Sequence, residues 1–201
     1  MKTTTTPREG LRERKRRERS RRIAETGLRL VLARGYEATT LDAIAAAAGI
    51  SRRTFFSYFR SKEDLLLAWQ SGIGEDLRAA IIAERPDRAP LAVVLAAAER
   101  VAAGYDLPDQ IAIERLSSST ERLRASRQAR YVDQENAVFA GLAELWPQAE
   151  RREGLRLVAM AAIGAVRIAV ERWVADDGRR PLIERVREAF AVLRSEIDRG
   201  G

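Results

Sequence analysis

The chain has 201 residues and contains neither cysteine nor histidine. These absences exclude disulfides, thiolate nucleophiles, Cys/His zinc sites and histidine general bases. A site made of carboxylates stays open, and the adjacent acids Asp176 and Asp177 are the pair considered for it. They precede Gly178 at a predicted helix end, where a solvated turn is the ordinary interpretation. We therefore expect a binding protein and not an enzyme, with no catalytic residue, no metal site and no cofactor.

Long hydrophobic runs are also missing. The longest uncharged apolar run, Leu157 to Val166, is far shorter than the roughly 20 residues of a membrane-spanning helix. The amino-terminal segment is polar and basic, without the apolar stretch of a secretory signal. We expect a cytoplasmic protein with no membrane partner.

Strand-like alternation, internal repeats and low-complexity tracts do not occur in the sequence. Apolar residues recur at helical spacing, so the sequence predicts an all-α fold of about nine helices. One predicted helix runs over residues 14–34 and ends at Gly35. Another is predicted as one continuous helix from about residue 62 to residue 83.

Positive charge is concentrated at the amino end. Residues 1–62 contain 16 Lys and Arg against 6 Asp and Glu, whereas residues 63–201 contain 20 against 23. This division indicates an amino-terminal module suited to a polyanion. Arginine outnumbers lysine 33 to 3, which suits bidentate pairing with guanine edges and phosphates. Genomic base composition explains the arginine excess equally well.

The segment from Thr39 to Leu66 has the pattern of a helix-turn-helix. Thr40 is placed to cap a first short helix, whose apolar face is formed by Leu41, Ile44, Ala45 and Ala48. Gly49 follows where a left-handed residue is needed, and Ser51 caps a second helix. Phe55 and Phe59 then face the core, which leaves the polar residues of this second helix on its other faces.

Polar and basic residues of this segment are the candidate DNA contacts. Arg52 and Arg53 are predicted to reach base edges. Ser61 caps the next helix with Asp64 three residues on, so Lys62 opposes the helix dipole there and suits a phosphate better. The full predicted DNA-binding set is Thr40, Ser51, Arg52, Arg53, Thr54, Ser57, Tyr58 and Lys62.

This segment resembles the DNA-binding domain of the tetracycline-repressor (TetR) family. The resembling residues cover about a quarter of the chain: Ile23, Gly35-Tyr36, Thr39-Thr40, Ile44-Ala45, Ala48-Gly49-Ile50-Ser51, Thr54-Phe55, Tyr58-Phe59, Ser61-Lys62-Glu63 and Leu65-Leu66. The run SRRTFFSYF is also similar to a subgroup that includes mycofactocin-associated regulators. Three positions depart from the family pattern, namely Ala43, Arg53 and Phe56, and Phe56 cannot donate a hydroxyl to a phosphate.

The resemblance implies a dimeric transcriptional regulator, usually a repressor, that leaves its operator when a small molecule binds the carboxy-terminal domain. It therefore implies three partners, namely palindromic double-stranded DNA, an effector and a second copy of the chain. The expected divisions are a disordered basic arm (1–13), a helix-turn-helix domain (14–66) and a ligand-binding and dimerisation domain (67–201). The basic run in the arm is either a solvated helix extension or a minor-groove contact.

Two faces near the carboxy end suit self-association, and burial inside one chain explains them equally well. The resemblance favours dimerisation through them. Their residues are Val158, Ala162, Ala165, Ala169, Trp173, Val186, Ala189, Phe190, Leu193 and Ile197.

The predicted effector is an apolar or amphipathic molecule that carries a negative group if Arg167 meets it. A buried arginine needs a partner, and an ion pair with Glu114, Glu135 or Glu171 is favoured over an anionic ligand. The predicted effector-binding set is Trp69, Ile73, Leu77, Tyr105, Ile111, Arg115, Ser119, Gln134, Phe139, Met160, Ile163 and Arg167. A non-specific architectural DNA-binding protein and a transcriptional activator are the competing functions.

Overall fold

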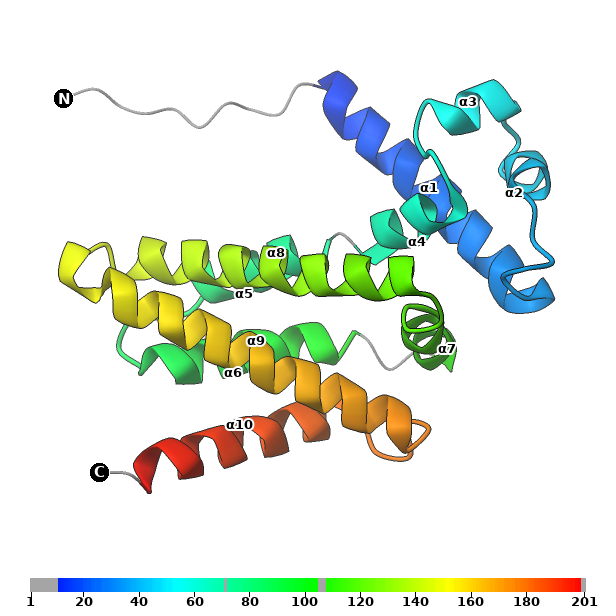
Figure 1. Cartoon of the computed structure of the whole chain (residues 1–201). Coiled ribbons are helices and arrows are strands. Elements are labelled where there is room, and N and C mark those ends of the chain that lie inside the picture. The colour runs from blue at the N-terminus through cyan, green and yellow to red at the C-terminus, as the bar shows by residue number, and fades with distance from the viewer. Residues whose placement is uncertain (1–10, 71, 105–107, 200–201) are drawn as a thin grey trace. The chain divides into compact units, whose positions relative to one another are not determined.

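A computed structural model describes residues 11–70, 72–104 and 108–199, with side chains except those of 11–14, 17, 67, 69, 70, 108 and 109. The described residues form ten α-helices and one short 3-10 helix, and no strand (Figure 1). The predicted all-α class is therefore confirmed. The helices are α1 (Leu11–Arg34), α2 (Leu41–Ala47), α3 (Arg52–Phe56), α4 (Lys62–Gln70), α5 (Ile73–Ile82), α6 (Pro90–Ala102), α7 (Pro108–Leu116), α8 (Glu121–Leu145), η1 (Ala149–Arg151), α9 (Arg152–Ala175) and α10 (Leu182–Asp198).

The helices fall into two compact units, Met1–Gln70 and Ser71–Gly201. In the first unit, α1 packs against both α2 and α4. Gly27 makes this approach possible, because a Cβ on it would lie 2.7 Å from Leu65 Cδ1 and 3.0 Å from Ile44 Cγ2. Phe55 and Phe59 close the core of the unit with 0% and 3% of their surface exposed.

Two boundaries differ from the sequence prediction. Helix α1 begins at Leu11, so residues 11–13 of the predicted disordered arm are helical, and residues 1–10 lie outside the described residues. The predicted continuous helix over 62–83 is instead two helices, of which α4 ends at Gln70 and α5 begins at Ile73. Glycine disfavours a helix interior because it loses more backbone freedom than alanine, and Gly72 and Gly74 lie at this break.

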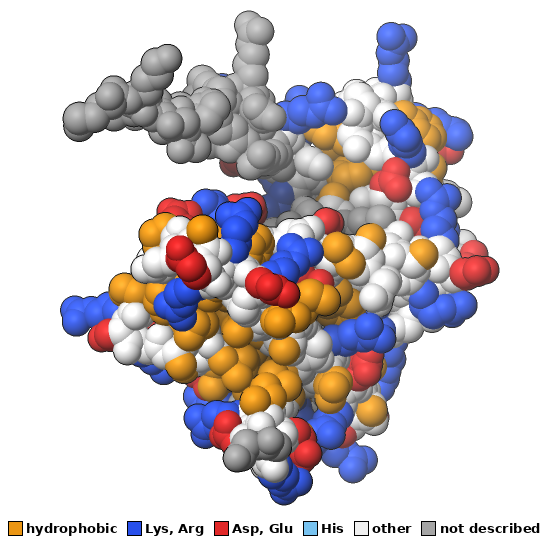
Figure 2. Space-filling model, turned by 60° about the vertical axis from the view of Figure 1, so that its left-hand side comes forward, with side chains coloured by type: hydrophobic (Ala, Val, Ile, Leu, Met, Phe, Trp, Pro, Cys, Tyr) orange, Lys and Arg blue, Asp and Glu red, His pale blue; other side chains and the backbone are white. Residues whose placement is uncertain are grey.

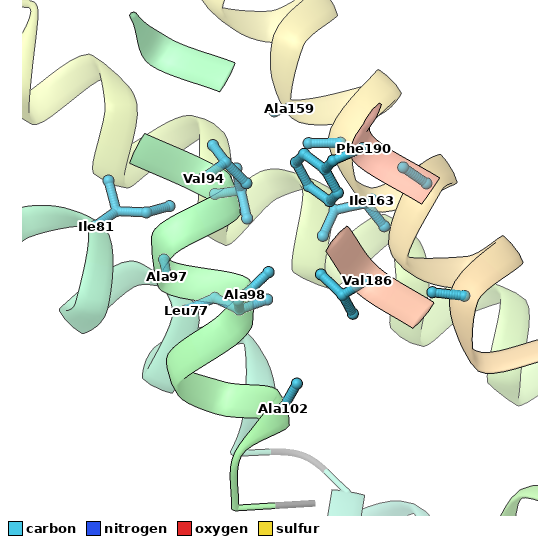
Figure 3. Packing of buried hydrophobic residues seen from close by; sticks show 14 of the residues in the cluster. Leu77, Ile81, Val94, Ala97, Ala98, Ala102, Ala159, Ile163, Val186 and Phe190 are labelled. Carbon is cyan, nitrogen blue, oxygen red and sulfur yellow. The ribbon is translucent and has the colours of Figure 1, made fainter. Parts of the chain in front are cut away.

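The second unit contains α5 to α10, with a single hydrophobic core. Helix α5 packs on α6 and α8, and α9 packs on α6, α8 and α10. Small side chains of α6, such as Ala97 and Ala98, face Leu77 of α5 on one side and Val186 of α10 on the other (Figure 3). Pro90 occupies the first position of α6. Proline suits this position because its fixed φ angle is helical and its missing N–H would have no partner within the helix.

The alanine-rich face of α9 and the main apolar face of α10 belong to this core. Seven residues of the predicted dimer interface are at most 6% exposed within one chain, so a second copy cannot bury them further. That part of the prediction is wrong, because helical periodicity identifies an apolar face without telling what covers it. The seven residues are Ala162, Ala165, Ala169, Trp173, Val186, Ala189 and Phe190.

A different face of these two helices is exposed and apolar. Leu157, Met160 and Ile168 of α9 are 60%, 46% and 48% exposed, and Val192 and Ile197 of α10 are 51% and 60% exposed. Figure 2 shows hydrophobic side chains gathered on the surface of the second unit. Among the described residues, no helix is both long and apolar enough to cross a membrane.

Candidate nucleic-acid interface and buried cavity

The supporting helix of the helix-turn-helix is α2. The Thr40 hydroxyl accepts a hydrogen bond from Ala43 N at 3.1 Å, which satisfies one free N–H group of the first turn. Ile44 and Ala45 are buried against the core. Gly49 follows with φ +66°, in the left-handed region that a glycine adopts without steric cost. The chain therefore turns sharply enough to start α3 three residues later, at Arg52.

Helix α3 is five residues long and is held at both ends by hydroxyl groups. Ser51 Oγ accepts from Thr54 N at 3.1 Å, and Ser57 Oγ donates to the Thr54 carbonyl at 2.7 Å. Phe55 is fully buried, which fixes the rotation of the helix about its axis. Arg52 and Arg53 consequently lie on the exposed side.

Arg52 is held in place before any DNA arrives. Its Nη1 donates to Asp42 Oδ2 at 3.1 Å, and its guanidinium carbon lies 5.7 Å from the centre of the exposed Phe56 ring. Both charged side chains of this pair are 64% exposed, so the pair is worth little in water. Asp42 therefore occupies one edge of the Arg52 guanidinium.

Several predicted phosphate contacts already have intramolecular roles. Tyr58 is half-buried, and the guanidinium carbon of Arg16 in α1 lies 5.7 Å from its ring centre. Arg16 Nη2 also donates to the Ser57 carbonyl at 3.2 Å. The sequence prediction missed Arg16, because its position in the basic run gave no sign that it reaches the end of α3.

Lys62 has a structural partner as well. Its Nζ donates to the Tyr36 carbonyl at 2.7 Å and lies 4.3 Å from the centre of the Tyr36 ring. The Tyr36 hydroxyl in turn donates to Glu63 Oε1 at 2.6 Å. These contacts explain a cation at the start of α4 without a phosphate, so the predicted phosphate role of Lys62 now stands beside a structural one.

The caps of α4 differ slightly from a reciprocal capping box. Ser61 Oγ accepts from Asp64 N at 3.2 Å, as the sequence predicts. Asp64 Oδ2 accepts from Arg60 N at 3.0 Å, one residue before the cap.

A cavity of about 50 Å³ lies inside the second unit. Its walls are mostly aliphatic and come from five helices besides α7, which contributes Glu114. A single drug-sized ligand needs roughly 300 Å³ or more, so this conformation has room for part of such a molecule. The lining residues are Ile73, Leu77, Ala98, Val101, Ala102, Glu114, Arg130, Tyr131, Gln134, Val166, Val170, Leu182 and Val186.

Three residues of the predicted effector-binding set line this cavity, namely Ile73, Leu77 and Gln134. The side chains of Trp69 and Tyr105 lie outside the described residues. Six others lie elsewhere in the unit. Ile163 is core, Met160 is exposed, and Phe139 packs beside Arg152 and Arg156. Ser119 Oγ donates to the Leu116 carbonyl, Arg115 pairs with Asp177, and Ile111 lies next to Gly178.

Arg167 is exposed and not in the cavity wall. Its Nε lies 3.1 Å from Glu171 Oε1, and Nη1 donates to Gln128 Oε1 at 3.2 Å. The predicted intramolecular ion pair with Glu171 is therefore confirmed, whereas the expectation of a buried Arg167 is wrong. Neighbouring residues on α9 point in directions about 100° apart, so one is core and the next is solvated. Helical periodicity in the sequence did not show on which side of this boundary Arg167 lies.

The charged residues that do face the cavity are Glu114 of α7 and Arg130 of α8, whose side chains are 4% and 10% exposed. Arg127 adds a second guanidinium, with Nε 3.8 Å from Glu114 Oε2. In the sequence, this cluster is only an acid on one predicted helix and arginines on the next. The structure shows that these residues are partners, because it brings Glu114 of α7 beside the arginines of α8. Among the described residues, no group of three acidic side chains is placed to hold a metal.

A capped recognition helix with exposed arginines, joined in one chain to a helical unit with a partly charged cavity, defines a DNA-binding regulator of the helix-turn-helix class. Residues 23–69 match the family model of bacterial regulatory proteins of the tetR family, and residues 89–198 match that of the MftR C-terminal domain. The chain therefore belongs to the TetR family. The second match also fits the narrower resemblance seen in SRRTFFSYF.

The curated relatives that match are similar over part of this chain. The regulator TcmR of Streptomyces glaucescens is 44% identical over 72 residues, which is 36% of this chain and 32% of TcmR. The chain thus spans about a third of the length of this relative.

Solved structures are similar over nearly the whole chain. The TetR-family repressor FadR of Thermus thermophilus, in complex with lauroyl-CoA, has a TM-score of 0.59 and 26% identity, with 88% of this chain and 92% of FadR covered. FadR of Bacillus subtilis, in complex with stearoyl-CoA, has a TM-score of 0.61 and 18% identity, covering 86% and 96%. The second likeness shows the fold alone.

Proposed function

We propose that this protein is a ligand-responsive repressor that places α3 in the major groove of operator DNA. The observation that supports this best is the orientation of α3, with Phe55 buried and Arg52 and Arg53 exposed. Arginine reads guanine through two parallel hydrogen bonds in the major groove. Hydroxyls of Thr40, Ser57 and Tyr58 and the Lys62 ammonium would hold phosphates on either side. Such a regulator acts where the chromosome is, in the cytoplasm.

The repressor would act as a homodimer, because one five-residue helix makes few base contacts. Two recognition helices about 34–36 Å apart read two half-sites one helical turn apart, which predicts a palindromic operator. The exposed apolar face of α9 and α10 supplies a surface for the second copy, through Leu157, Met160, Ile168, Val192 and Ile197. Gly164 lies between Met160 and Ile168, and a Cβ there would meet nothing within 4 Å, so the surface is open.

The effector would be an amphipathic molecule that enters the second unit at the cavity. FadR of Thermus thermophilus, 26% identical to this chain, is a repressor in complex with lauroyl-CoA. Aliphatic walls with a few charged groups suit such a molecule. Because the cavity holds only about 50 Å³ in this conformation, an acyl chain must displace neighbouring side chains or helices.

Release from DNA follows if the effector prefers the displaced arrangement. A ligand with equal affinity for both arrangements shifts nothing. A coupling free energy of about 1–3 kcal/mol between the effector and operator sites would reduce operator affinity between 5- and 150-fold.

The test is selection of binding sites from random duplexes, followed by titration of the selected duplex with lauroyl-CoA. We expect a palindrome with half-site centres about 10–10.5 base pairs apart and release of the protein by lauroyl-CoA but not by free CoA. Failure to enrich any sequence would contradict the operator function and favour an architectural DNA-binding protein. A reporter gene behind the selected site separates repression from activation.

A further inference from the structure

Arg130 is an unusual residue for the wall of an aliphatic cavity. Its side chain is 10% exposed, and its neighbours in the wall include Leu77, Val166 and Val186. Figure 3 shows Leu77 and Val186 on either side of the small α6 residues Ala98 and Ala102 that also line this space. A buried charge in apolar surroundings is costly unless it is paired and hydrogen-bonded.

The hydrogen bonds of this guanidinium are incomplete. Nη2 donates to Glu114 Oε1 at 3.5 Å, which is a long contact. The Nε and Nη1 atoms of Arg130 are buried, and neither has an acceptor among the described residues. A buried donor left without an acceptor is destabilising, and more so for a charged group. Most buried polar groups in proteins are satisfied, so this one calls for a cause.

Positive charge also exceeds negative charge around this position. The carbons of three guanidinium groups, from Arg127, Arg130 and Arg167, lie 5.7 to 5.8 Å from the Tyr131 ring centre. The carboxylates that these arginines meet at salt-bridge distance are Glu114 and Glu171. Glu114 is shared by Arg127 and Arg130, and Glu171 by Arg127 and Arg167. Three cations around the Tyr131 ring therefore share two anions, and of these five charged groups Arg130 and Glu114 line the cavity.

We propose that Arg130 is the anion anchor of the effector site, receiving a carboxylate or phosphate oxygen of a ligand whose apolar part fills the aliphatic cavity. The inference rests on the proposed effector function and adds the ligand class: an apolar body with an anionic head held inside the unit. A charge-assisted hydrogen bond from Arg130 satisfies its free donors and offsets the excess positive charge. Because the cavity holds about 50 Å³ in this conformation, it must widen to admit the apolar part, as the proposed effector function already requires.

The test compares three probes with one chain length: dodecanoate, lauroyl-CoA and dodecanol. Their dissociation constants are measured by calorimetry on the full-length protein and on Arg130→Gln, Arg130→Lys and Arg85→Gln. Arg85 is exposed between α5 and α6 and controls for the loss of one positive charge. Thermal unfolding of each variant checks that it folds.

We expect the wild type to bind at least one anionic probe about 10- to 100-fold more tightly than dodecanol, as a charge-assisted hydrogen bond in a buried site would give. Arg130→Gln should lose this preference with little change for dodecanol, Arg130→Lys should keep part of it, and Arg85→Gln should keep all of it. A preference confined to dodecanoate identifies a carboxylate, and one confined to lauroyl-CoA identifies the phosphates of CoA.

Glu114→Gln provides a test of opposite sign if Arg130→Gln does not fold. Removing the carboxylate that competes for Arg130 should tighten binding of the anionic probe and leave dodecanol unchanged. Equal affinity of the wild type for dodecanoate, lauroyl-CoA and dodecanol overturns the role of Arg130 and leaves the effector function standing. Binding of no probe, together with an operator complex that none of them releases, overturns both.

Discussion

At the residue scale, the candidate DNA-reading side chains are restrained differently. Arg52 is paired with Asp42 and lies near the Phe56 ring, whereas Arg53 is simply exposed. A restrained arginine loses less rotamer freedom when it binds, but it must exchange a carboxylate for a base edge. The contact with Asp42 therefore has two opposite effects on DNA binding: it orients the Arg52 guanidinium in advance, and it competes with a base for the same donor.

Arg52→Ala tests the base-reading role. We expect a loss of about 1–3 kcal/mol in binding to the selected operator and a smaller loss on random duplex, because base contacts discriminate and phosphate contacts do not. Fluorescence anisotropy at one fixed salt concentration measures both. Arg34→Ala, exposed at the end of α1, is the matched control for charge and should lower both affinities equally. The same uniform loss for Arg52→Ala would rule out base reading.

Asp42→Asn tests the competition from the other side. Removal of the carboxylate frees the Arg52 guanidinium and removes one negative charge beside the phosphates, so operator affinity should rise. Anisotropy titrations of the single variants and of Asp42→Asn with Arg52→Ala separate the two effects. If release of Arg52 contributes, Asp42→Asn should raise operator affinity less in the Arg52→Ala variant than in the wild type. Unchanged affinity in Asp42→Asn means that the pair does not limit binding.

The turn after α9 offers a prediction on pH. The hydrogen bond from Arg185 lowers the pKa of Asp176 below its ordinary value, and Arg180 does the same for Glu188. A lowered pKa contributes stability above the unfolded pKa of about 4, which is lost as pH falls through the folded value. Asp176→Asn should therefore melt below wild type at pH 7, and the difference should shrink below about pH 4. Asp198→Asn, exposed at the end of α10, is the control. A difference that stays constant with pH would contradict this.

At the element scale, short helices depend on what holds their ends. Helix α3 has only five residues and would not be stable alone, since isolated helices need about 12–15 residues. Its serine caps and the burial of Phe55 replace the missing length. Helix α7 is held by the turn after α9, where Arg115 pairs with Asp177 and donates to the Val174 carbonyl at 3.3 Å.

Gly178→Ala should loosen α7 at this turn. Gly178 has φ +66°, and a Cβ there would lie 2.5 Å from Ile111 Cδ1 of α7. Strain and overpacking together should cost about 1 kcal/mol or more in the free energy of unfolding. Urea unfolding measures the change, and Ile111→Ala in the same chain should relieve the overpacking part. Gly154→Ala, inside α9 with open space around it, should be neutral or stabilising. Equal effects of Gly178→Ala and Gly154→Ala on the free energy of unfolding would contradict the expected strain and overpacking at Gly178.

At the scale of the whole molecule, two surfaces differ in kind. Residues 1–62 carry a clear excess of positive over negative charge, with 16 Lys and Arg against 6 Asp and Glu, and the second unit has an exposed apolar face on α9 and α10. Exposed apolar patches of this kind are typical of interfaces between proteins. A two-fold interface uses the same patch on both copies, so one substitution acts twice.

Ile168→Glu should convert the proposed dimer to a monomer. Each copy would bury an unpaired carboxylate in the interface, and operator affinity should fall because both half-sites are no longer read together. Sedimentation velocity gives the oligomeric state and anisotropy the affinity. Val132→Glu on α8, at a residue 44% exposed, is the matched control and should leave the dimer intact. A wild-type chain that sediments as a monomer would contradict the proposed interface.

The amino-acid sequence alone is enough to predict the helical class, the caps of α2, α3 and α4 and the basic character of the amino end. These follow from short-range chemistry: Thr40, Ser51 and Ser61 accept from N–H groups three residues away, and Gly49 adopts its left-handed angle locally. Charge is a property of composition and needs no fold.

The packing of the helices was needed to show which apolar faces are core, which arginine reaches the cavity and which partners Arg16, Arg52 and Lys62 have. Ala162 and Trp173 are buried while Met160 is exposed, although all lie on one apolar helix. Arg130 meets Glu114 only because α7 and α8 pack together, and Arg167 is turned outward to Glu171. Burial and pairing depend on contacts between segments far apart in the chain, and helical periodicity carries no information about which segment arrives on which face.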